Sequence, residues 1–310
     1  MADLGNLIEH LKKLDTERVN PDTVDLDRLS ALEIVRKINR EDKKVAAVVE
    51  QALPPIAAAA ELYAATLRAG GRAVYLGAGT SGRLGVLDAA ECPPTFGTDP
   101  GQVVGVIAGG PSALVLSAEG AEDNEASAVA DLERVRLAAR DFVIGLAAST
   151  RTPYTLAGLK YARSLGCRTA FIVCNKADQL EVPPDILITL PVGPEAITGS
   201  TRMKSGTAQK MALNMISTTA MVLLGKTLGN LMIDLQARSA KLAARSRKIL
   251  MELLGIPLEQ ADELLRQSGG SVKVAIVMHQ FKIDRVEAEA RLAEAGGFVS
   301  RLNKTGRPGK

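Results

Sequence analysis

The sequence predicts an α/β fold, in which helices cover both faces of a parallel sheet, followed by a small C-terminal helical module. Short apolar runs rich in β-branched residues recur along the chain, and longer segments with helical spacing separate them. Buried parallel strands are apolar nearly throughout and are joined by helical crossovers, so this alternation indicates a parallel sheet. Beyond residue 248 the strand-like runs stop, and short amphipathic segments follow.

The elements are predicted in order from these runs. Five strands are expected at 73–76, 103–108, 142–147, 169–174 and 186–192. Helices are expected at 47–67, 83–90, 112–118, 125–139, 154–165 and 204–224, and in the module at 249–254, 258–267, 271–281 and 285–294. Ser30 and Glu33 have the spacing of a capping box before a helical stretch at 32–38. The predicted parts are a helical extension (1–45), the sheet domain (46–248), the helical module (249–300) and a basic tail (301–310).

Composition excludes several classes of function. Lys and Arg number 38 against 35 Asp and Glu, a net charge of +3, which argues against nucleic acid as the main partner. Three cysteines are too few for a disulfide framework. The longest apolar run, Met211–Leu224, is too short to span a bilayer and is predicted to be a helix in the core or at a subunit interface. The chain opens without a secretory leader, so we expect a cytoplasmic protein with no membrane partner.

A glycine-rich loop after the first strand is the strongest local signal for a site. Gly77, Gly79 and Gly82 satisfy G-x-G-x-x-G, which allows a dinucleotide site. Such a site needs an acidic residue near the end of the second strand, and none stands there. The hydroxyls of Thr80 and Ser81 favour a loop that binds one phosphomonoester.

Two further hydroxyl clusters follow later strands. Ser149 and Thr152 follow the third strand, and Ser200 and Thr201 follow the fifth, just before the long helix. In a flavodoxin-like strand order the loops after strands 1 and 3 flank one crevice at the carboxyl edge of the sheet, where ligands bind. Ordinary helix capping by Ser200 or Thr201 is the alternative for the third cluster.

Acid–base candidates are few. His10 lies in the polar extension and His279 in the C-terminal module, so neither is expected near the three loops. Carboxylates must then move any proton. Five stand near the glycine loop or after the second strand, and the sequence pattern does not choose among them: Asp88, Glu91, Glu119, Glu122 and Asp123.

At this point the motifs resemble those of the N-acetylmuramic acid 6-phosphate etherase family. Tyr75–Thr95 resembles the family signature, and four further motifs follow in the family's order, at 119–123, 152–154, 198–210 and 229–232. The resemblance implies a sugar isomerase (SIS) fold with a five-stranded parallel sheet, working as a homodimer without metal or nucleotide. It implies lyase activity that removes D-lactate from the sugar phosphate during cell-wall amino-sugar recycling.

The resemblance also implies roles for individual residues. Glu91 matches the family's proton donor and Glu122 its second catalytic carboxylate. Thr80, Ser81, Ser149, Thr152, Ser200 and Thr201 match positions that contact the sugar phosphate. Two alternatives remain: an aldose–ketose isomerase on the same fold, and a non-catalytic sugar-phosphate sensor such as the glucokinase regulatory protein. The paired glutamates favour the etherase over both.

Overall fold

The computed structural model describes residues 5, 11–12, 14–177, 180–235 and 239–302. The chain divides into two compact units, residues 1–90 with 103–217, and residues 91–102 with 218–310. His10 and the predicted tail from residue 303 on lie outside the described residues. Among the described residues no single helix is long and apolar enough to span a bilayer, although the bent pair 31–51 and 53–68 meets that criterion when taken together.

The first unit is built on a five-stranded parallel sheet of β1 (Ala73–Gly77), β2 (Val103–Ile107), β3 (Phe142–Leu146), β4 (Arg168–Val173) and β5 (Ile186–Thr189). Its order is β2-β1-β3-β4-β5, which confirms the predicted flavodoxin-like arrangement. Ala73 pairs with Val103 on one side and with Phe142 on the other, so the carboxyl ends of β1, β2 and β3 are level. The loops after these strands therefore share one edge.

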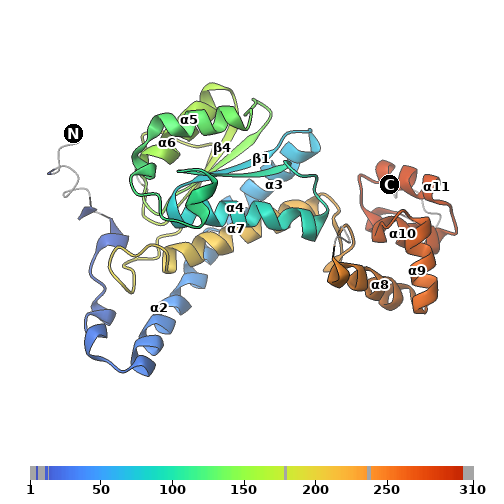
Figure 1. Cartoon of the computed structure of the whole chain (residues 1–310), viewed down its shortest axis with the longest axis horizontal. Helices are drawn as coiled ribbons and strands as arrows, with labels where there is room; N and C mark the ends of the chain where they lie inside the picture. Colours follow the sequence, from blue (N-terminus) through green and yellow to red (C-terminus); the bar gives the residue numbers. More distant parts are fainter. Residues whose placement is uncertain (1–4, 6–10, 13, 178–179, 236–238, 303–310) are drawn as a thin grey trace. The chain divides into compact units, whose positions relative to one another are not determined.

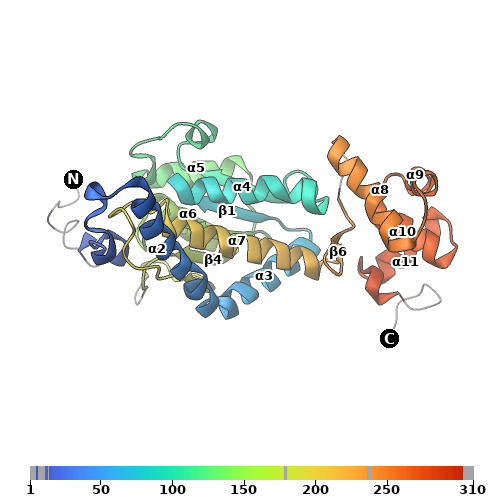
Figure 2. The same cartoon turned by 90° about the horizontal axis from the view of Figure 1, so that it is seen from below.

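Helices cover both faces of this sheet (Figures 1 and 2). On one face lie α5 (Glu125–Arg134) and α6 (Pro153–Ser164); on the other lie α3 (Leu53–Arg68), α4 (Gly79–Phe96) and α7 (Lys204–Leu223). Alternate strand residues divide between the faces. Leu76 and Val143 belong to the core under α5 and α6, whereas a Cβ at Gly85 of α4 would lie 2.8 Å from Tyr75. Burial of both faces explains the near-continuous apolar strands.

The N-terminal segment packs on the first unit. Three 3₁₀ turns, Asp15–Glu17, Pro21–Thr23 and Leu26–Arg28, lead into α2 (Ala31–Gln51). The predicted capping box is present, because the Glu33 carboxylate accepts from the Ser30 backbone N–H at 2.9 Å. Asn175, after β4, donates to Thr16 Oγ1 at 3.1 Å and accepts from Thr16 N–H at 3.3 Å, which fixes the segment to the carboxyl edge of the sheet.

Several helix boundaries differ from the prediction, each for a local reason. The helix predicted at 47–67 is broken at Ala52, and α2 and α3 meet there at 64° because Pro54 cannot continue α2. The helix predicted at 83–90 is longer, Gly79–Phe96, with Pro93 and Pro94 in its last turns, and Gly97 N–H still donates to Pro93 O. The helix predicted at 112–118 is only a 3₁₀ turn, Pro111–Leu114. Finally, α5 ends before Arg136, whose φ is +54°.

The second unit is mainly helical. It contains a short antiparallel pair, β6 (Thr227–Leu228) and β7 (Leu231–Met232), and the helices α8 (Ala240–Leu254), α9 (Leu258–Gln267), α10 (Val272–Phe281) and α11 (Arg285–Glu294). Apolar side chains from the hairpin and all four helices form one core, among them Ile233, Leu250 and Ile276. The unit also includes residues 91–102, which contain the end of α4 and the segment that follows it.

Candidate active site

The glycine loop after β1 turns tightly and begins α4 at the carboxyl edge of the sheet. A Cβ at Gly82 would lie 2.5 Å from the carbonyl oxygen of Gly77, so both positions require glycine for the close approach. Thr80 is half-buried and Ser81 is buried in the first turn of α4. The free N–H groups of this turn and the hydroxyls beside them are suited to an anion.

The start of α7 lies against this loop. A Cβ at Gly206 would lie 3.3 Å from Thr80 Cγ2 and 3.6 Å from Thr201 O, so the predicted residues Thr80 and Thr201 are neighbours. Ser81 Oγ donates to Gln209 Oε1 at 2.8 Å, one turn further along α7. The structure thus brings the first and third predicted hydroxyl clusters together.

The loop after β3 is joined to the same region through β4. Cys174 N–H donates to Ala148 O at 3.0 Å, and Cys174 Sγ lies 3.6 Å from Ser205 O. Ser149 Oγ and Thr152 Oγ1 are 3.5 Å apart, and Thr152 makes no side-chain cap on α6, so neither is committed to capping its helix. Burial raises the pKa of the Cys174 thiol to about 12, which makes it a packing group rather than a nucleophile.

The N-terminus of α7 is closed by a carboxylate of the chain itself. Glu195 is fully buried and accepts from the backbone N–H of Lys204 at 2.8 Å, and from N–H and Oγ of Ser205 at 2.9 and 2.7 Å. Glu195, rather than Ser200 or Thr201, therefore caps this helix, and the N–H groups of Lys204 and Ser205 are not open to a ligand anion. Among the described residues no side chain caps the start of α6.

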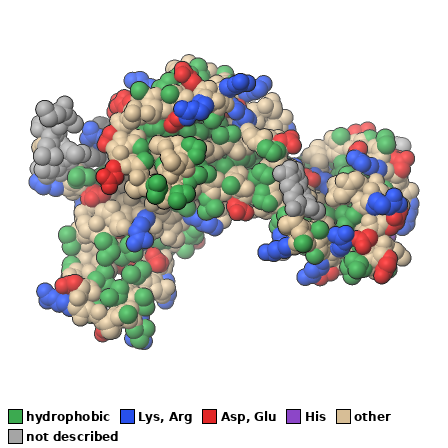
Figure 3. Space-filling model, viewed as in Figure 1, with side chains coloured by type: hydrophobic (Ala, Val, Ile, Leu, Met, Phe, Trp, Pro, Cys, Tyr) green, Lys and Arg blue, Asp and Glu red, His purple; other side chains and the backbone are tan. Residues whose placement is uncertain are grey.

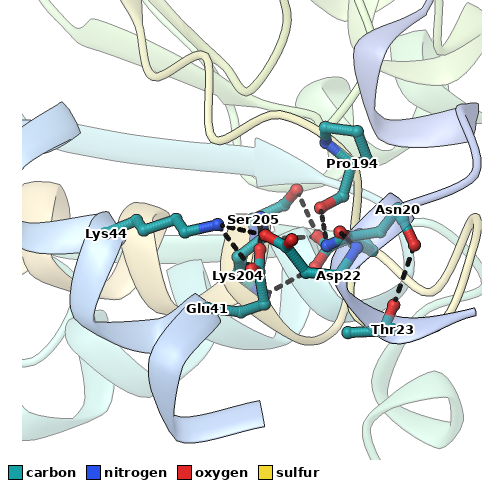
Figure 4. A network of polar contacts seen from close by, with 9 residues as sticks. Asn20, Asp22, Thr23, Glu41, Lys44, Pro194, Lys204 and Ser205 are labelled. Atoms are coloured by element: carbon teal, nitrogen blue, oxygen red, sulfur yellow. Dashed lines mark hydrogen bonds and ion pairs between the residues drawn. The ribbon is translucent and has the colours of Figure 1, made fainter. Parts of the chain in front are cut away.

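Lys204 is used in a buried ion pair (Figure 4). Its Nζ donates to Glu41 Oε2 on α2 at 2.7 Å, and both side chains are almost entirely inaccessible to solvent. Lys44 binds the other oxygen of Glu41 at 2.5 Å. These contacts lower the pKa of the Glu41 carboxyl to about 2, against the opposing effect of its burial. Lys204 is therefore not available to bind a phosphate; it fastens the start of α7 to α2.

A pocket of about 250 Å³ opens at the ends of β1 and β2. It is lined by Ala78, Gly79, Arg83, Ala108, Ala113 and 117–122. Glu122 lies in the 3₁₀ turn Ala121–Asp123, and both Glu122 and Glu119 are exposed residues that line the pocket. Gly109 has φ +83° and allows this segment to approach closely, because a Cβ at Gly109 would lie only 2.7 Å from the Cβ of Ala118.

The structure separates the five candidate carboxylates. Asp88 is buried and accepts from Tyr75 Oη at 2.7 Å and Ser217 Oγ at 3.0 Å; burial raises its pKa, and its contacts make it a structural link between β1, α4 and α7. Glu119 and Glu122 line the pocket, and Asp123 is exposed beside it. Glu91 is exposed on α4 and is not among the lining residues. It stands about two turns beyond Arg83, roughly 12 Å along the helix axis.

Comparison with known proteins gives the family. The chain is 54% identical over 297 residues to the N-acetylmuramic acid 6-phosphate etherase of Erwinia tasmaniensis, covering 96% of this chain and 95% of the relative. It is 50% identical over 299 residues to that of Rhodopirellula baltica, covering 96% and 99%. The chain belongs to the N-acetylmuramic acid 6-phosphate etherase family.

Two other comparisons match part of the chain. The model of the glucokinase regulatory protein N-terminal SIS domain matches residues 55–163. Among solved structures, a putative phosphosugar isomerase from Bacteroides fragilis aligns at 18% identity with a TM-score of 0.49, covering 63% of this chain and 91% of the other.

Sequence reasoning gave no role to three residues that lie beside the predicted site residues: Glu195, Gln209 and Arg83. Glu195 and Gln209 act through partners on other elements, and Gln209 is separated by 128 positions from Ser81. Both stand in or beside motifs that carry the family resemblance, which was the only available signal. Arg83 belongs to the glycine loop motif itself, and only the pocket distinguishes it from a surface arginine.

Proposed function

We propose that the protein cleaves the D-lactyl ether of N-acetylmuramic acid 6-phosphate, giving N-acetylglucosamine 6-phosphate and D-lactate, a step of amino-sugar metabolism. The observation that carries the proposal is its match, over nearly the whole chain, to relatives named as this etherase. The arrangement at the carboxyl edge of the sheet supports it, because hydroxyl-bearing loops and a carboxylate pocket adjoin at the start of α4.

The phosphate is held by neutral donors in this proposal. Thr80, Ser81, Ser149, Thr152, Ser200 and Thr201 supply hydroxyls, and the open starts of α4 and α6 supply backbone N–H groups. Anchoring the non-reacting C6 end positions C2 and C3 for the reaction and reduces misplacement.

Glu122 is the base in the proposed mechanism. In the ring-opened sugar the C1 aldehyde acidifies the C2 hydrogen, and Glu122 removes it. The electron pair forms a C2–C3 double bond as the bond from C3 to the lactyl oxygen breaks. Glu91 protonates the departing lactyl oxygen, and water then adds to C3 while a proton returns to C2. Each positioned proton transfer contributes about 10²- to 10⁴-fold.

Glu91 takes part only if it reaches the same sugar as Glu122. It does not line the pocket that holds Glu122, and it is exposed on α4. We therefore assign it to the pocket of a second copy of the chain, in a homodimer. Exposed apolar side chains on α2, Leu32 and Val35 among them, support such an assembly (Figure 3).

The test is incubation with N-acetylmuramic acid 6-phosphate in deuterated water, with assay of D-lactate and of deuterium at C2. The wild-type protein is expected to release lactate. Glu91→Gln is expected to lose at least about 10²-fold of lactate release while still binding the sugar phosphate. Glu122→Gln is expected to lose both lactate release and exchange at C2.

Two results would contradict the proposed reaction, and a third would contradict only the role of Glu91. Hexose 6-phosphate interconversion without lactate would identify an isomerase, and tight sugar-phosphate binding with no turnover would identify a sensor. Full turnover by Glu91→Gln would remove that residue from the mechanism while leaving the reaction intact.

A further inference from the structure

Arg83 lines the pocket that holds Glu122, and its guanidinium has no counter-ion among the described residues. It is half-buried on the first turns of α4, where Nε and Nη2 donate to the carbonyl oxygens of Leu114 and Leu116, both at 3.3 Å. Among the described residues no carboxylate forms an ion pair with it, and Nη1 has no hydrogen-bond partner. One edge of the guanidinium is therefore held by the loop, and the rest is available to a ligand.

The two carboxylates in the pocket make a cation necessary when an anionic substrate binds there. Glu119 and Glu122 both line it, so Arg83 is the only cationic residue beside two carboxylates in that lining. The substrate of the proposed reaction carries a carboxylate on the lactyl group, attached through the oxygen at C3, next to the C2 atom from which Glu122 takes a proton. A third carboxylate would be repelled from this pocket unless a cation paired with it.

The substrate has two anionic groups, and its shape decides which one meets Arg83. The phosphate is on C6, at the far end of the sugar from C2 and C3. The hydroxyls expected to hold it come from Thr80, Thr201 and the loop after β3, whereas Arg83 shares its pocket with Glu122. The C3 substituent is therefore the anion within reach of Arg83 when C2 is at Glu122.

We propose that Arg83 binds the lactyl carboxylate of the substrate and so selects sugar 6-phosphates that carry an acidic ether at C3. The inference rests on the proposed function. A guanidinium pairs with a carboxylate through two parallel N–H···O bonds, and here Nη1 and the second hydrogen of Nη2 supply the two donors. Holding the carboxylate also aligns the C3–O bond for cleavage, and the product sugar lacks the group, so this contact does not retain it.

The experiment compares two substrates in the full-length protein. One is N-acetylmuramic acid 6-phosphate, and the other is the same compound with the lactyl carboxylate converted to a carboxamide. The wild type is expected to prefer the carboxylate by roughly 10- to 100-fold in kcat/KM, the worth of a hydrogen bond to a charged group. Arg83→Met is expected to lose that preference, mainly through KM, and Arg83→Lys to keep part of it. Binding of N-acetylglucosamine 6-phosphate should change little in either variant.

Controls separate the possible failures. Arg140→Met removes an exposed arginine just before β3, at the opposite edge of the sheet, and should leave the preference unchanged. An active Arg83→Met or Arg83→Lys variant that keeps the full wild-type preference would overturn the inference. If either variant weakened the binding of the substrate and of the product sugar equally, the inference would also be overturned, because Arg83 would then bind the phosphate or stabilise the fold. A wild-type protein that releases no lactate would instead refute the proposed function.

Discussion

Ser81 and Gln209 form a hydrogen bond, and which of the two side chains donates in it determines whether the Ser81 hydroxyl can donate to an anion. In the structure Ser81 Oγ donates to Gln209 Oε1, and the buried Nε2 of Gln209 has no partner among the described residues. Half a turn of the amide would let Nε2 donate to Ser81 Oγ instead. This exchanges an unpartnered buried donor for an unpartnered acceptor and releases the Ser81 hydrogen for a phosphate oxygen. We expect the turned amide in the substrate complex.

Gln209→Glu tests this pairing. An ionised carboxylate only accepts, so it holds the Ser81 hydrogen away from the phosphate. We expect KM for the sugar phosphate to rise about tenfold at neutral pH with little change in kcat. Lowering the pH protonates the introduced carboxyl, restores a donor and should bring KM back toward the wild-type value. Gln209→Met is the matched neutral control. A KM as high in Gln209→Met as in Gln209→Glu, with no dependence on pH, would show that only packing matters here.

At the residue scale the sequence selects candidates by their position along the chain. The hydroxyls of Thr80, Ser149 and Ser200 were selected because each follows the end of a predicted strand or precedes a helix, and their roles stay predictions. Glu195 was missed because a carboxylate that caps a helix nine positions later has no local spacing to reveal it. The roles of Glu91 and Glu122 rest on the family resemblance and stay predictions.

At the scale of elements, the sequence predicted where strands begin more accurately than where helices end. Each strand begins within one residue of its predicted start, because a buried parallel strand is a compact apolar run. Helix ends were harder, since α2 ends next to Pro54 whereas α4 continues through Pro93, so a proline alone does not show where a helix stops. The pairing of α2 with α7 through Glu41 and Lys204 joins residues 163 positions apart and has no sequence signal.

Lys204→Met tests how much the Glu41–Lys204 ion pair, which connects α2 and α7, contributes to the free energy of unfolding. Removing the cation leaves Glu41 with only Lys44 and buries an unmatched carboxylate, so we expect a loss of about 3–5 kcal/mol in the free energy of unfolding. The double variant Glu41→Leu with Lys204→Met should regain most of that loss, because two apolar side chains replace the pair. Denaturant unfolding at neutral pH measures both. Equal losses in the single and the double variants would mean that packing, rather than charge, holds the joint.

The Glu41–Lys204 pair also makes the stability of the fold depend on pH, and stability falls as the pH falls. The pKa of Glu41 is about 2 in the folded protein against 4.5 for an ordinary glutamate. A lowered carboxyl pKa stabilises the fold at pH values above 4.5, and this contribution, about 3 kcal/mol, is lost as the pH falls from 4.5 toward 2. The wild type should therefore lose stability over that range more steeply than the double variant. Parallel acid-unfolding curves for the two proteins would contradict the assignment.

At the scale of the whole molecule, exposed apolar side chains bear on how many chains form one active site. In the first unit the α2 helix leaves Leu32 and Val35 each 56% exposed, and α7, which ends in the second unit, leaves Val222 42% exposed. These apolar surfaces, together with the exposed position of Glu91, support the homodimer predicted from the sequence. Sedimentation at micromolar concentration should give twice the chain mass. A monomer that retains full etherase activity would show that one chain supplies every catalytic group.

Mixing two inactive variants decides whether Glu91 acts in the pocket of a second copy. In a dimer of one Glu91→Gln chain and one Glu122→Gln chain, sites shared between chains leave one of the two sites with both glutamates intact. Random pairing makes half of all dimers mixed, so coexpression should restore about a quarter of wild-type lactate release, the fraction that follows when each working site acts independently. If each chain supplied both glutamates to its own site, every site would lack one of them. No recovery in coexpressed, demonstrably mixed dimers would therefore place both carboxylates within one chain.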